Sequence, residues 1–131
     1  MKKSIGNVAD IDKLLAELVH LETRRRVVLD DLVRADPLVV GSLAVVRRTC
    51  GKSTCHCAQK DGSGHPTSVL MSTGTAGRRC QVVRKMDVEQ LHTLVDRYRR
   101  FREGLRSLKL LESEMNDKLR ELMSFRDVGY S

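Results

Sequence analysis

Residues 50–57 read CGKSTCHC, and His65-Pro66 follow after a short polar loop. Apart from the cysteines, Ala58 is the only apolar side chain before Pro66, so this stretch buries too little hydrocarbon to offset the entropy of ordering it. Three thiols and an imidazole could hold it instead, by closing on a single Zn²⁺ as a Cys3His tetrahedron. We therefore predict a zinc site with these ligands: Cys50, Cys55, Cys57 and His65.

The identity of the fourth ligand stays open between His65 and Cys80. The spacing Cys-x4-Cys-x-Cys-x7-His is looser than the paired Cys-x2-Cys motif of many zinc sites. His56 is poorly placed, because it stands between two cysteines that would both turn inward. Cys80 lies in an apolar-alternating run, which favours a small buried hydrophobe over a ligand. The alternative to a metal site is a solvated loop with three reduced thiols.

The length of 131 residues predicts one domain, or one domain with a helical extension. Two Phe, two Tyr and no Trp leave the core to Leu and Val, which suits helix packing. No apolar run reaches membrane length and no signal-peptide segment follows Met1, so we expect a cytoplasmic protein without a membrane partner. Cytosolic thiols stay reduced, which favours a metal site over a disulfide.

The net charge of +7 is concentrated around the cysteines. Residues 1–36 carry seven basic and seven acidic side chains, and residues 86–131 carry nine of each. Residues 37–85 carry eight basic side chains against one acid, Asp61. A concentrated positive field is typical of proteins that bind a phosphate backbone, whereas an ordinary solvated surface is the alternative. We expect phosphate contacts from seven of these residues: Arg47, Arg48, Lys52, Arg78, Arg79, Arg84 and Lys85.

Two long helices are predicted to flank this basic segment. The first begins near Asn7 or Asp10, either of which can cap it, and ends at Asp36-Pro37. Its apolar residues recur every three or four positions as a heptad seam that only Arg25 interrupts. The second begins at Asp87 and carries a longer seam from Leu91 to Leu122, broken by Glu112.

Three short strands are predicted between the helices, at residues 43–48, 68–73 and 78–85, with a turn at residues 74–77. The fold class is therefore α+β and mostly α. Two long antiparallel helices form a coiled-coil hairpin that flanks a small three-stranded antiparallel, zinc-knuckle-like β unit. The segments are the N-terminal helix, 1–36, the basic Cys-rich unit, 37–85, and the C-terminal helix, 86–131.

Antiparallel pairing of the helices predicts that Leu32 lies near Leu91 and Leu14 near Leu108. The second helix is the longer one, so its last turns would lack a cover within the chain. The uncovered seam residues are Met115, Leu119 and Leu122. An uncovered heptad is normally covered by another copy of itself, so we expect a homodimer.

One face of the second helix carries basic residues at spacings of three and four, namely Arg99, Arg102, Arg106 and Lys109. Exposed coiled-coil positions are commonly charged, which is the alternative explanation. Because these residues lie on the half nearer the cysteines, we expect Arg99, Arg102 and Arg106 to extend the nucleic-acid-binding surface.

A catalytic site is not predicted. Gly51-Lys52-Ser53 resembles the end of a phosphate-binding P-loop, but Val46 stands where that motif needs a glycine. No pair of carboxylates or Ser/His/Asp order accompanies the cysteines, so we expect a nonenzymatic protein.

Short motifs between Gly41 and about Leu108 carry a resemblance to known sequences: Gly41-Ser42-Leu43, Arg47-Arg48-Thr49-Cys50-Gly51-Lys52, Cys55-His56-Cys57-Ala58, His65-Pro66 and Tyr98-Arg99-Arg100-Phe101-Arg102-Glu103. On these motifs the chain resembles an uncharacterised family of short prokaryotic proteins, often found near transposases and other mobile elements. Family members tend to place aromatic residues after the His-Pro element, whereas Thr67, Ser68 and Val69 stand here. This departure favours backbone contacts by Arg and Lys over base stacking.

Two functions follow as expectations. The first is a zinc-stabilised nucleic-acid-binding accessory protein of a mobile element, with DNA rather than RNA as the expected partner. The second is an adaptor that docks a larger nuclease or recombinase through the helical seam.

Overall fold

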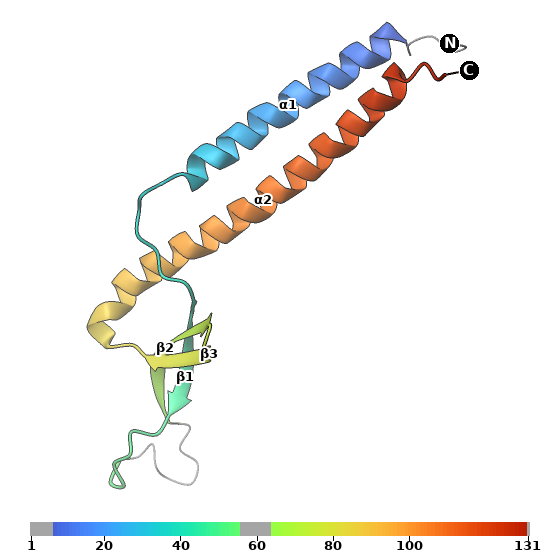
Figure 1. Ribbon diagram of the computed structural model, residues 1–131. Coiled ribbons are helices and arrows are strands. Elements are labelled where there is room, and N and C mark those ends of the chain that lie inside the picture. The colour runs from blue at the N-terminus through green and yellow to red at the C-terminus, as the bar shows by residue number, and fades with distance from the viewer. Residues whose placement is uncertain (1–6, 56–63, 131) are drawn as a thin grey trace. The chain divides into compact units, whose positions relative to one another are not determined.

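The computed structural model describes residues 7–55 and 64–130. Figure 1 shows the elements in chain order, and their bounds are α1 Val8–Leu32, β1 Ser42–Arg48, β2 His65–Gly74, β3 Gly77–Val82, the 3-10 turn η2 Lys85–Asp87 and α2 Val88–Arg126. The expected α+β class is confirmed: the chain is mostly helical, with two helices and a three-stranded antiparallel sheet. None of the described helices is both long enough and apolar enough to cross a membrane.

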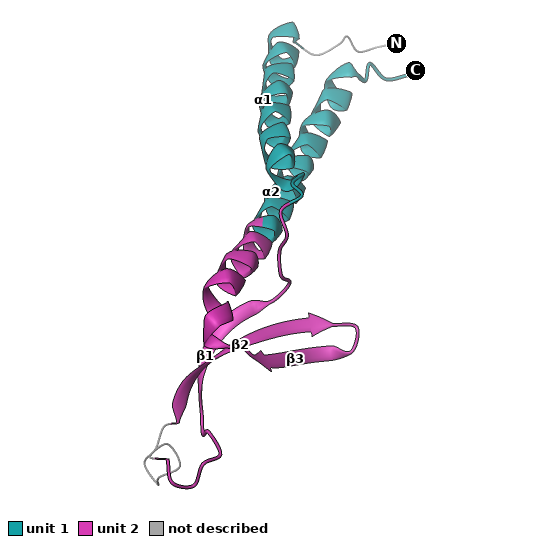
Figure 2. Cartoon of the chain, turned by 90° about the vertical axis from the view of Figure 1, so that its left-hand side faces the viewer, with its two compact units in different colours: residues 1–35, 101–131 teal, residues 36–100 magenta. Residues whose placement is uncertain are grey.

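The chain divides into two compact units, coloured separately in Figure 2. Residues 1–35 and 101–131 form the first, called here the helical unit. Residues 36–100 form the second, called here the sheet unit. The first thirteen residues of α2 therefore belong to the sheet unit.

In the helical unit, α1 begins where one of the two expected caps stands. The side-chain oxygen of Asn7 accepts a hydrogen bond of 2.9 Å from the backbone N–H of Ala9, which satisfies a donor that the first helical turn leaves open. Leu14 and Leu21 on α1 and Leu111 on α2 are buried, and they form the described core of this unit.

Two contacts fix how far α1 is displaced along α2. The Lys118 ammonium lies 2.8 Å from the Glu17 carboxylate. A Cβ added to Gly104 would lie 2.6 Å from Cδ2 of Leu32, so Leu32 occupies the space beside this glycine. Residue n of α1 therefore lies level with about residue 136 − n of α2.

The expected helix register was wrong. Leu32 lies beside Gly104, which is thirteen residues further along α2 than the predicted partner Leu91. One consequence concerns the last turns of α2, which were expected to have no cover within the chain. Met115 and Leu122 are half-buried, so that expectation was wrong for them, whereas Leu119 remains exposed.

The physical reason for the shift is that the connection after α1 is hydrogen-bonded to the first turns of α2. The backbone N–H of Val39 donates to the carbonyl of Leu94 at 3.1 Å. The Arg97 guanidinium donates to the carbonyl of Pro37 at 3.0 Å. These two bonds hold the connection after α1 against residues 94–97, so α1 pairs with the part of α2 that follows.

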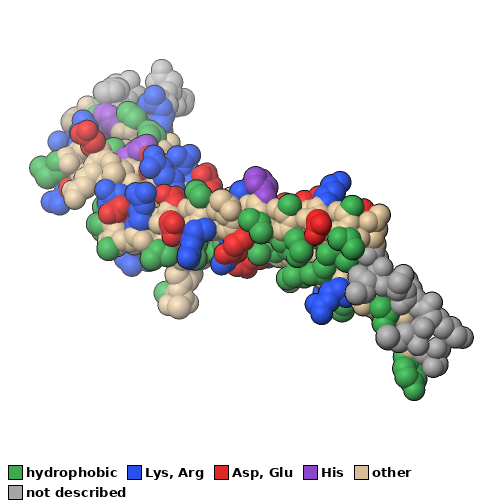
Figure 3. Space-filling view, turned by 90° about the horizontal axis from the view of Figure 1, so that it is seen from above, with side chains coloured by type: hydrophobic (Ala, Val, Ile, Leu, Met, Phe, Trp, Pro, Cys, Tyr) green, Lys and Arg blue, Asp and Glu red, His purple; other side chains and the backbone are tan. Residues whose placement is uncertain are grey.

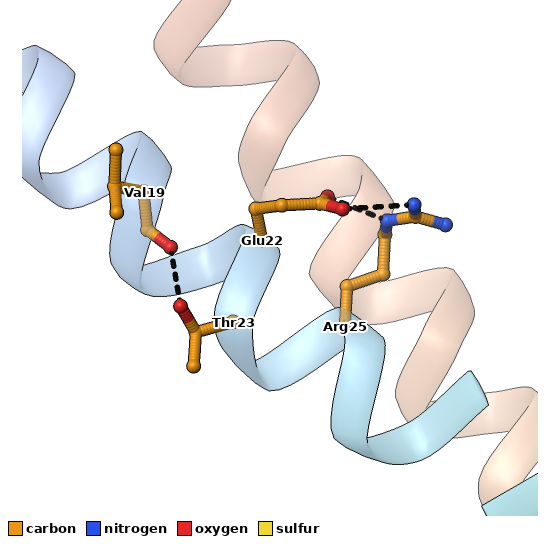
Figure 4. Close-up of polar contacts among 4 residues, drawn as sticks. All are labelled: Val19, Glu22, Thr23 and Arg25. Atoms are coloured by element: carbon orange, nitrogen blue, oxygen red, sulfur yellow. Dashed lines mark hydrogen bonds and ion pairs between the residues drawn. The ribbon is translucent and has the colours of Figure 1, made fainter. Parts of the chain in front are cut away.

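Arg25, which was expected to interrupt the first seam, forms an ion pair with Glu22 on α1. Figure 4 shows the Glu22 and Arg25 side chains turned toward each other, with Nε 2.8 Å and Nη2 3.1 Å from the two carboxylate oxygens. The hydrogen bond from Arg25 lowers the pKa of Glu22. The same hydrogen bond raises the pKa of Arg25, and the negative charge of Glu112 raises it further. The residues that break the two seams, Arg25 and Glu112, therefore lie at the same level of the helical unit.

In the sheet unit, the strands pair in the order β1-β2-β3, and both pairings are antiparallel. Val69 at the middle of β2 is fully buried and pairs with Ala44 on β1 and Val82 on β3. Every residue of β3 is exposed. The strand β2 begins three residues earlier than expected, at His65, and β3 ends three residues earlier, at Val82.

Candidate metal centre and basic surface

The connection between β1 and β2 begins and ends at one place in the sheet. Arg48, the last residue of β1, is paired with His65, the first residue of β2. Cys50 follows Arg48 by two residues, so the ladder itself brings the first cysteine close to the histidine. The hairpin pairing thus supplies two of the predicted ligands from positions fifteen residues apart in the sequence.

A tight turn then returns the chain toward His65. Gly51 has a φ of +81°, a conformation that favours glycine. The backbone N–H of Cys55 donates to the carbonyl of Lys52 at 3.1 Å, which closes the turn between the first two cysteines. This turn is why a spacing of Cys-x4-Cys can present both sulfur atoms to one point.

Gly64 and Arg47 secure the other end of the connection. Gly64 has a φ of +79°, and a Cβ there would lie 2.8 Å from the carbonyl carbon and oxygen of Arg48. The Arg47 guanidinium donates to the carbonyl of Gly64 at 3.0 Å. Sequence reasoning missed both roles, although a glycine directly before His65 was a usable signal for a close backbone approach.

Cys50, Cys55 and His65 form a cluster that could hold a metal ion. Their ligand atoms all lie within 4.8 Å of one another, and Sγ of Cys55 is 3.1 Å from Nε2 of His65. Tetrahedral zinc, with bonds of about 2.3 Å to sulfur and about 2.0 Å to nitrogen, requires S···N separations of about 3.5 Å. Small side-chain shifts therefore suffice to admit an ion. Cys55 and His65 are half-buried, whereas Cys50 is exposed.

The structure places one of the two candidates for the fourth ligand, His65, beside Cys50 and Cys55 and the other, Cys80, far from them. His65 belongs to the cluster. Cys80 pairs with Met71, six residues along β2 from His65, which places it about 20 Å away at 3.3 Å per residue. Cys80 is also exposed, so its expected role as a small buried hydrophobe was wrong. The remaining predicted ligand, Cys57, lies outside the described residues.

Most of the net charge lies in the same unit as the cluster. The sheet unit carries eleven Lys and Arg against five Asp and Glu, a net charge of +6. The helical unit carries thirteen against twelve, a net charge of +1. All seven basic residues predicted around the cysteines are exposed: Arg47, Arg48, Lys52, Arg78, Arg79, Arg84 and Lys85.

These basic residues do not form a single group. Arg47, Arg48 and Lys52 lie at the cluster end of the sheet, where Arg48 pairs with His65. Arg78 and Arg79 lie at the other end, where Arg78 pairs with Thr73. Thr73 follows His65 by eight positions along β2, or about 26 Å. We call these sets the cluster-end group and the turn-end group.

The other predicted basic residues have specific surroundings. Arg84 and Lys85 follow β3, and Nε of Arg84 lies 2.8 Å from the Asp87 carboxylate, which neutralises part of its charge. Arg99 belongs to the sheet unit and lies 3.4 Å from the Asp96 carboxylate. Arg102 and Arg106 are exposed residues of the helical unit.

A comparison of the chain with protein-family models, curated proteins and solved structures found no match. The resemblance to short prokaryotic proteins of mobile elements therefore stays a prediction.

Proposed function

We propose that the protein is a nonenzymatic, zinc-stabilised nucleic-acid-binding accessory protein that works as a homodimer. The observation that carries the proposal is the cluster of Cys50, Cys55 and His65, which lies in the unit that holds +6 of the net charge of +7. A metal site and a concentrated positive field in one small unit are the combination that a structural zinc module for a polyanion needs.

Zinc is the ion that suits these donors. Thiolate and imidazole are ligands for zinc, whereas magnesium and calcium prefer oxygen. Cys57 would complete a Cys3His set, since it follows Cys55 by two residues. The ion would act as a cross-link between β1 and β2, and a fully ligated site of this kind is structural.

Metal content tests this part directly. We expect one zinc per chain in protein purified without added metal, measured by mass spectrometry against protein concentration. Cys55→Ser should lose the metal, and the matched control Cys80→Ser should retain it. A metal content near zero in well-folded protein would contradict the proposal.

The two basic groups suggest how the sheet unit would contact a nucleic acid. Their separation of about 26 Å along β2 is close to the rise of eight base pairs at about 3.4 Å each. Arg and Lys contacts to phosphates position a protein without reading bases, so we expect binding with little sequence preference and a preference for duplex DNA. Duplexes shorter than about eight base pairs should contact only one group.

Fluorescence anisotropy with labelled duplexes, single strands and RNA at increasing salt tests this contact. The affinity should fall steeply with salt, because each neutralised phosphate releases counterions. Substituting Arg78→Glu and Arg79→Glu together should reduce the slope of log K against log salt by about two. Arg120→Glu with Arg126→Glu makes the same charge change in the helical unit and should have a much smaller effect. Binding that ignores salt, or equal losses in both variants, would contradict the proposal.

The adaptor function is the second candidate, and the exposed hydrophobic residues of α2 favour it. In that case the helical unit would dock a larger nuclease or recombinase of a mobile element, and the basic sheet unit would follow the nucleic acid that this partner holds. The isolated protein would then fail to bind any of the labelled nucleic acids at low salt.

A further inference from the structure

One side of the helical unit exposes large hydrophobic residues from both helices. Leu15 and Val19 on α1, and Leu119 and Met123 on α2, have exposed fractions between 44% and 67%. The register places Leu15 and Val19 level with about residues 121 and 117 of α2, so all four lie in the same part of the unit. Figure 3 shows hydrophobic side chains gathered over the helices toward the end where the termini lie. We call these four residues the apolar patch.

The positions of the buried leucines show that the four residues share one side. Each residue turns the helix by about 100°, so Leu15 and Val19 lie about 100° and 140° round α1 from the buried Leu14. Leu119 and Met123 lie about 80° and 120° round α2 from the buried Leu111. Antiparallel helices are related by a local two-fold axis, so equal rotations away from the shared core bring both pairs to the same side.

We propose that a second copy of this chain covers the apolar patch, with α1 of each copy packed on α2 of the other in an antiparallel four-helix bundle. A flat layer of two helices is matched in shape by another layer of two helices. When the two-fold axis runs parallel to the helices, each residue of α2 meets α1 of the other copy at its own level. Leu119 then inserts between Leu15 and Val19 of the second copy.

Two pairs of oppositely charged residues on the same side agree with this arrangement. Glu112 lies about 100° round α2 from Leu111 and level with about residue 24, which places it near the exposed Arg26 of the second copy. Lys109 and Asp30 stand at the outer edge of their helices, each about 160° from the buried leucine, and their levels differ by about three residues. Both pairs are opposite in sign, and charge complementarity fixes register and partner. Glu22, about 80° round α1 from Leu14 and level with about residue 114, would also lie near Glu112 of the second copy, and its charge is compensated by Arg25 on its own helix.

This inference rests on the homodimer of the proposed function and names its interface. Sedimentation equilibrium without nucleic acid tests it over micromolar concentrations. Wild-type protein should be a dimer, and Leu119→Lys should weaken dimerisation by more than about a hundredfold, because the lysine charge would be buried without a partner. The matched control is Leu110→Lys, on a residue of α2 that is 62% exposed and lies on the opposite side. The control should remain a dimer, and circular dichroism should confirm that both variants are folded.

A charge exchange tests the register. Glu112→Arg and Arg26→Glu should each weaken the dimer, and the chain that carries both changes should regain it. A monomeric wild type, a dimer that tolerates Leu119→Lys, or a double variant that fails to recover would overturn the inference. A dimer that binds no nucleic acid would instead contradict only the nucleic-acid part of the proposed function, so the two failures are distinguishable.

Discussion

The helical unit and the sheet unit differ in what can hold them together. The helical unit buries three leucines and is nearly neutral, whereas Val69 is the only buried hydrophobic residue among the described residues of the sheet unit, which carries a net charge of +6. Leucine packing stabilises the first unit, but one buried valine contributes little to offset the entropy of ordering the described residues of the second. The difference indicates that buried hydrocarbon can hold the helical unit, whereas the sheet unit needs a further contribution, which the proposed metal site would supply.

The largest expected effect is the loss of the metal, which should affect one unit only. Removal of zinc with a chelator, or Cys55→Ser, should abolish the hydrogen-exchange protection of β1 and β2, because the energy of metal binding is folding energy. The helical unit should keep its protection. Hydrogen exchange with mass spectrometry measures both at once, and Cys80→Ser should match the wild type. Equal loss of hydrogen-exchange protection in both units would show that the metal does not stabilise the sheet unit alone.

The helical unit should respond instead to the loss of buried hydrocarbon. Leu21→Ala should lower its free energy of unfolding by about 2–5 kcal/mol, since it removes a buried side chain and leaves a cavity. Val27→Ala, at an exposed position of the same helix, should change it by less than about 0.5 kcal/mol. Urea denaturation of the zinc-bound protein measures both changes. Similar values for the two variants would show that α1 is not held by its leucines.

Two glycines beside the cluster, Gly51 and Gly64, should differ in how strongly their substitution weakens metal binding. Gly51→Ala should lower the free energy of unfolding by about 1–2 kcal/mol, because φ is +81°. Nothing lies within 4 Å of the added Cβ, so no steric clash adds to this strain. Gly64→Ala should lower the free energy of unfolding by more, because its φ is +79° and the added Cβ would also lie 2.8 Å from the Arg48 backbone. Competition with a chromophoric chelator should therefore show weaker zinc binding for Gly64→Ala than for Gly51→Ala. The reverse order would contradict the described connection.

The smallest expected effect concerns the half-buried ion pair between Glu17 and Lys118 in the helical unit. The hydrogen bond with Lys118 lowers the pKa of Glu17, and the same bond raises the pKa of Lys118. The stability that Glu17 contributes is present above its unfolded-state pKa and is lost as the pH falls through its lowered folded-state value. Lys118→Met should remove this part of the acid dependence, and denaturation curves recorded from pH 3 to pH 6 (about the range in which Glu titrates) measure it. An unchanged acid dependence would mean that the pair is not formed in solution.

Local patterns predicted the elements of this fold well. The Asn7 cap, the strand pattern and the turn at residues 74–77 depend on neighbouring residues, and all three were confirmed within a few positions. The helix register could not be predicted in the same way, because a heptad seam looks alike after a shift of whole turns. Bonds from Val39 and Arg97 decided it, and they join residues far apart in the sequence.

The candidate site was predictable in part for a related reason. Cysteine and histidine types identified Cys50, Cys55 and His65 as ligands, and the structure brings these three together. The choice between His65 and Cys80 needed the pairing of β2 with β3, because spacing along the chain does not measure distance across a sheet. The division of the basic residues into two groups also depends on that pairing.

Gly104 limits where residues can be inserted in α1, because Leu32 must stay beside it. A glycine inside a helix costs about 0.5–1 kcal/mol, and here its missing side chain leaves the recess that Leu32 fills. A residue inserted between Leu21 and Leu32 would rotate the leucine by about 100° and empty the recess, whereas residues added before α1 begins would leave it filled. Residues added before Val8 are therefore tolerable, whereas an insertion or deletion between Leu21 and Leu32 is not.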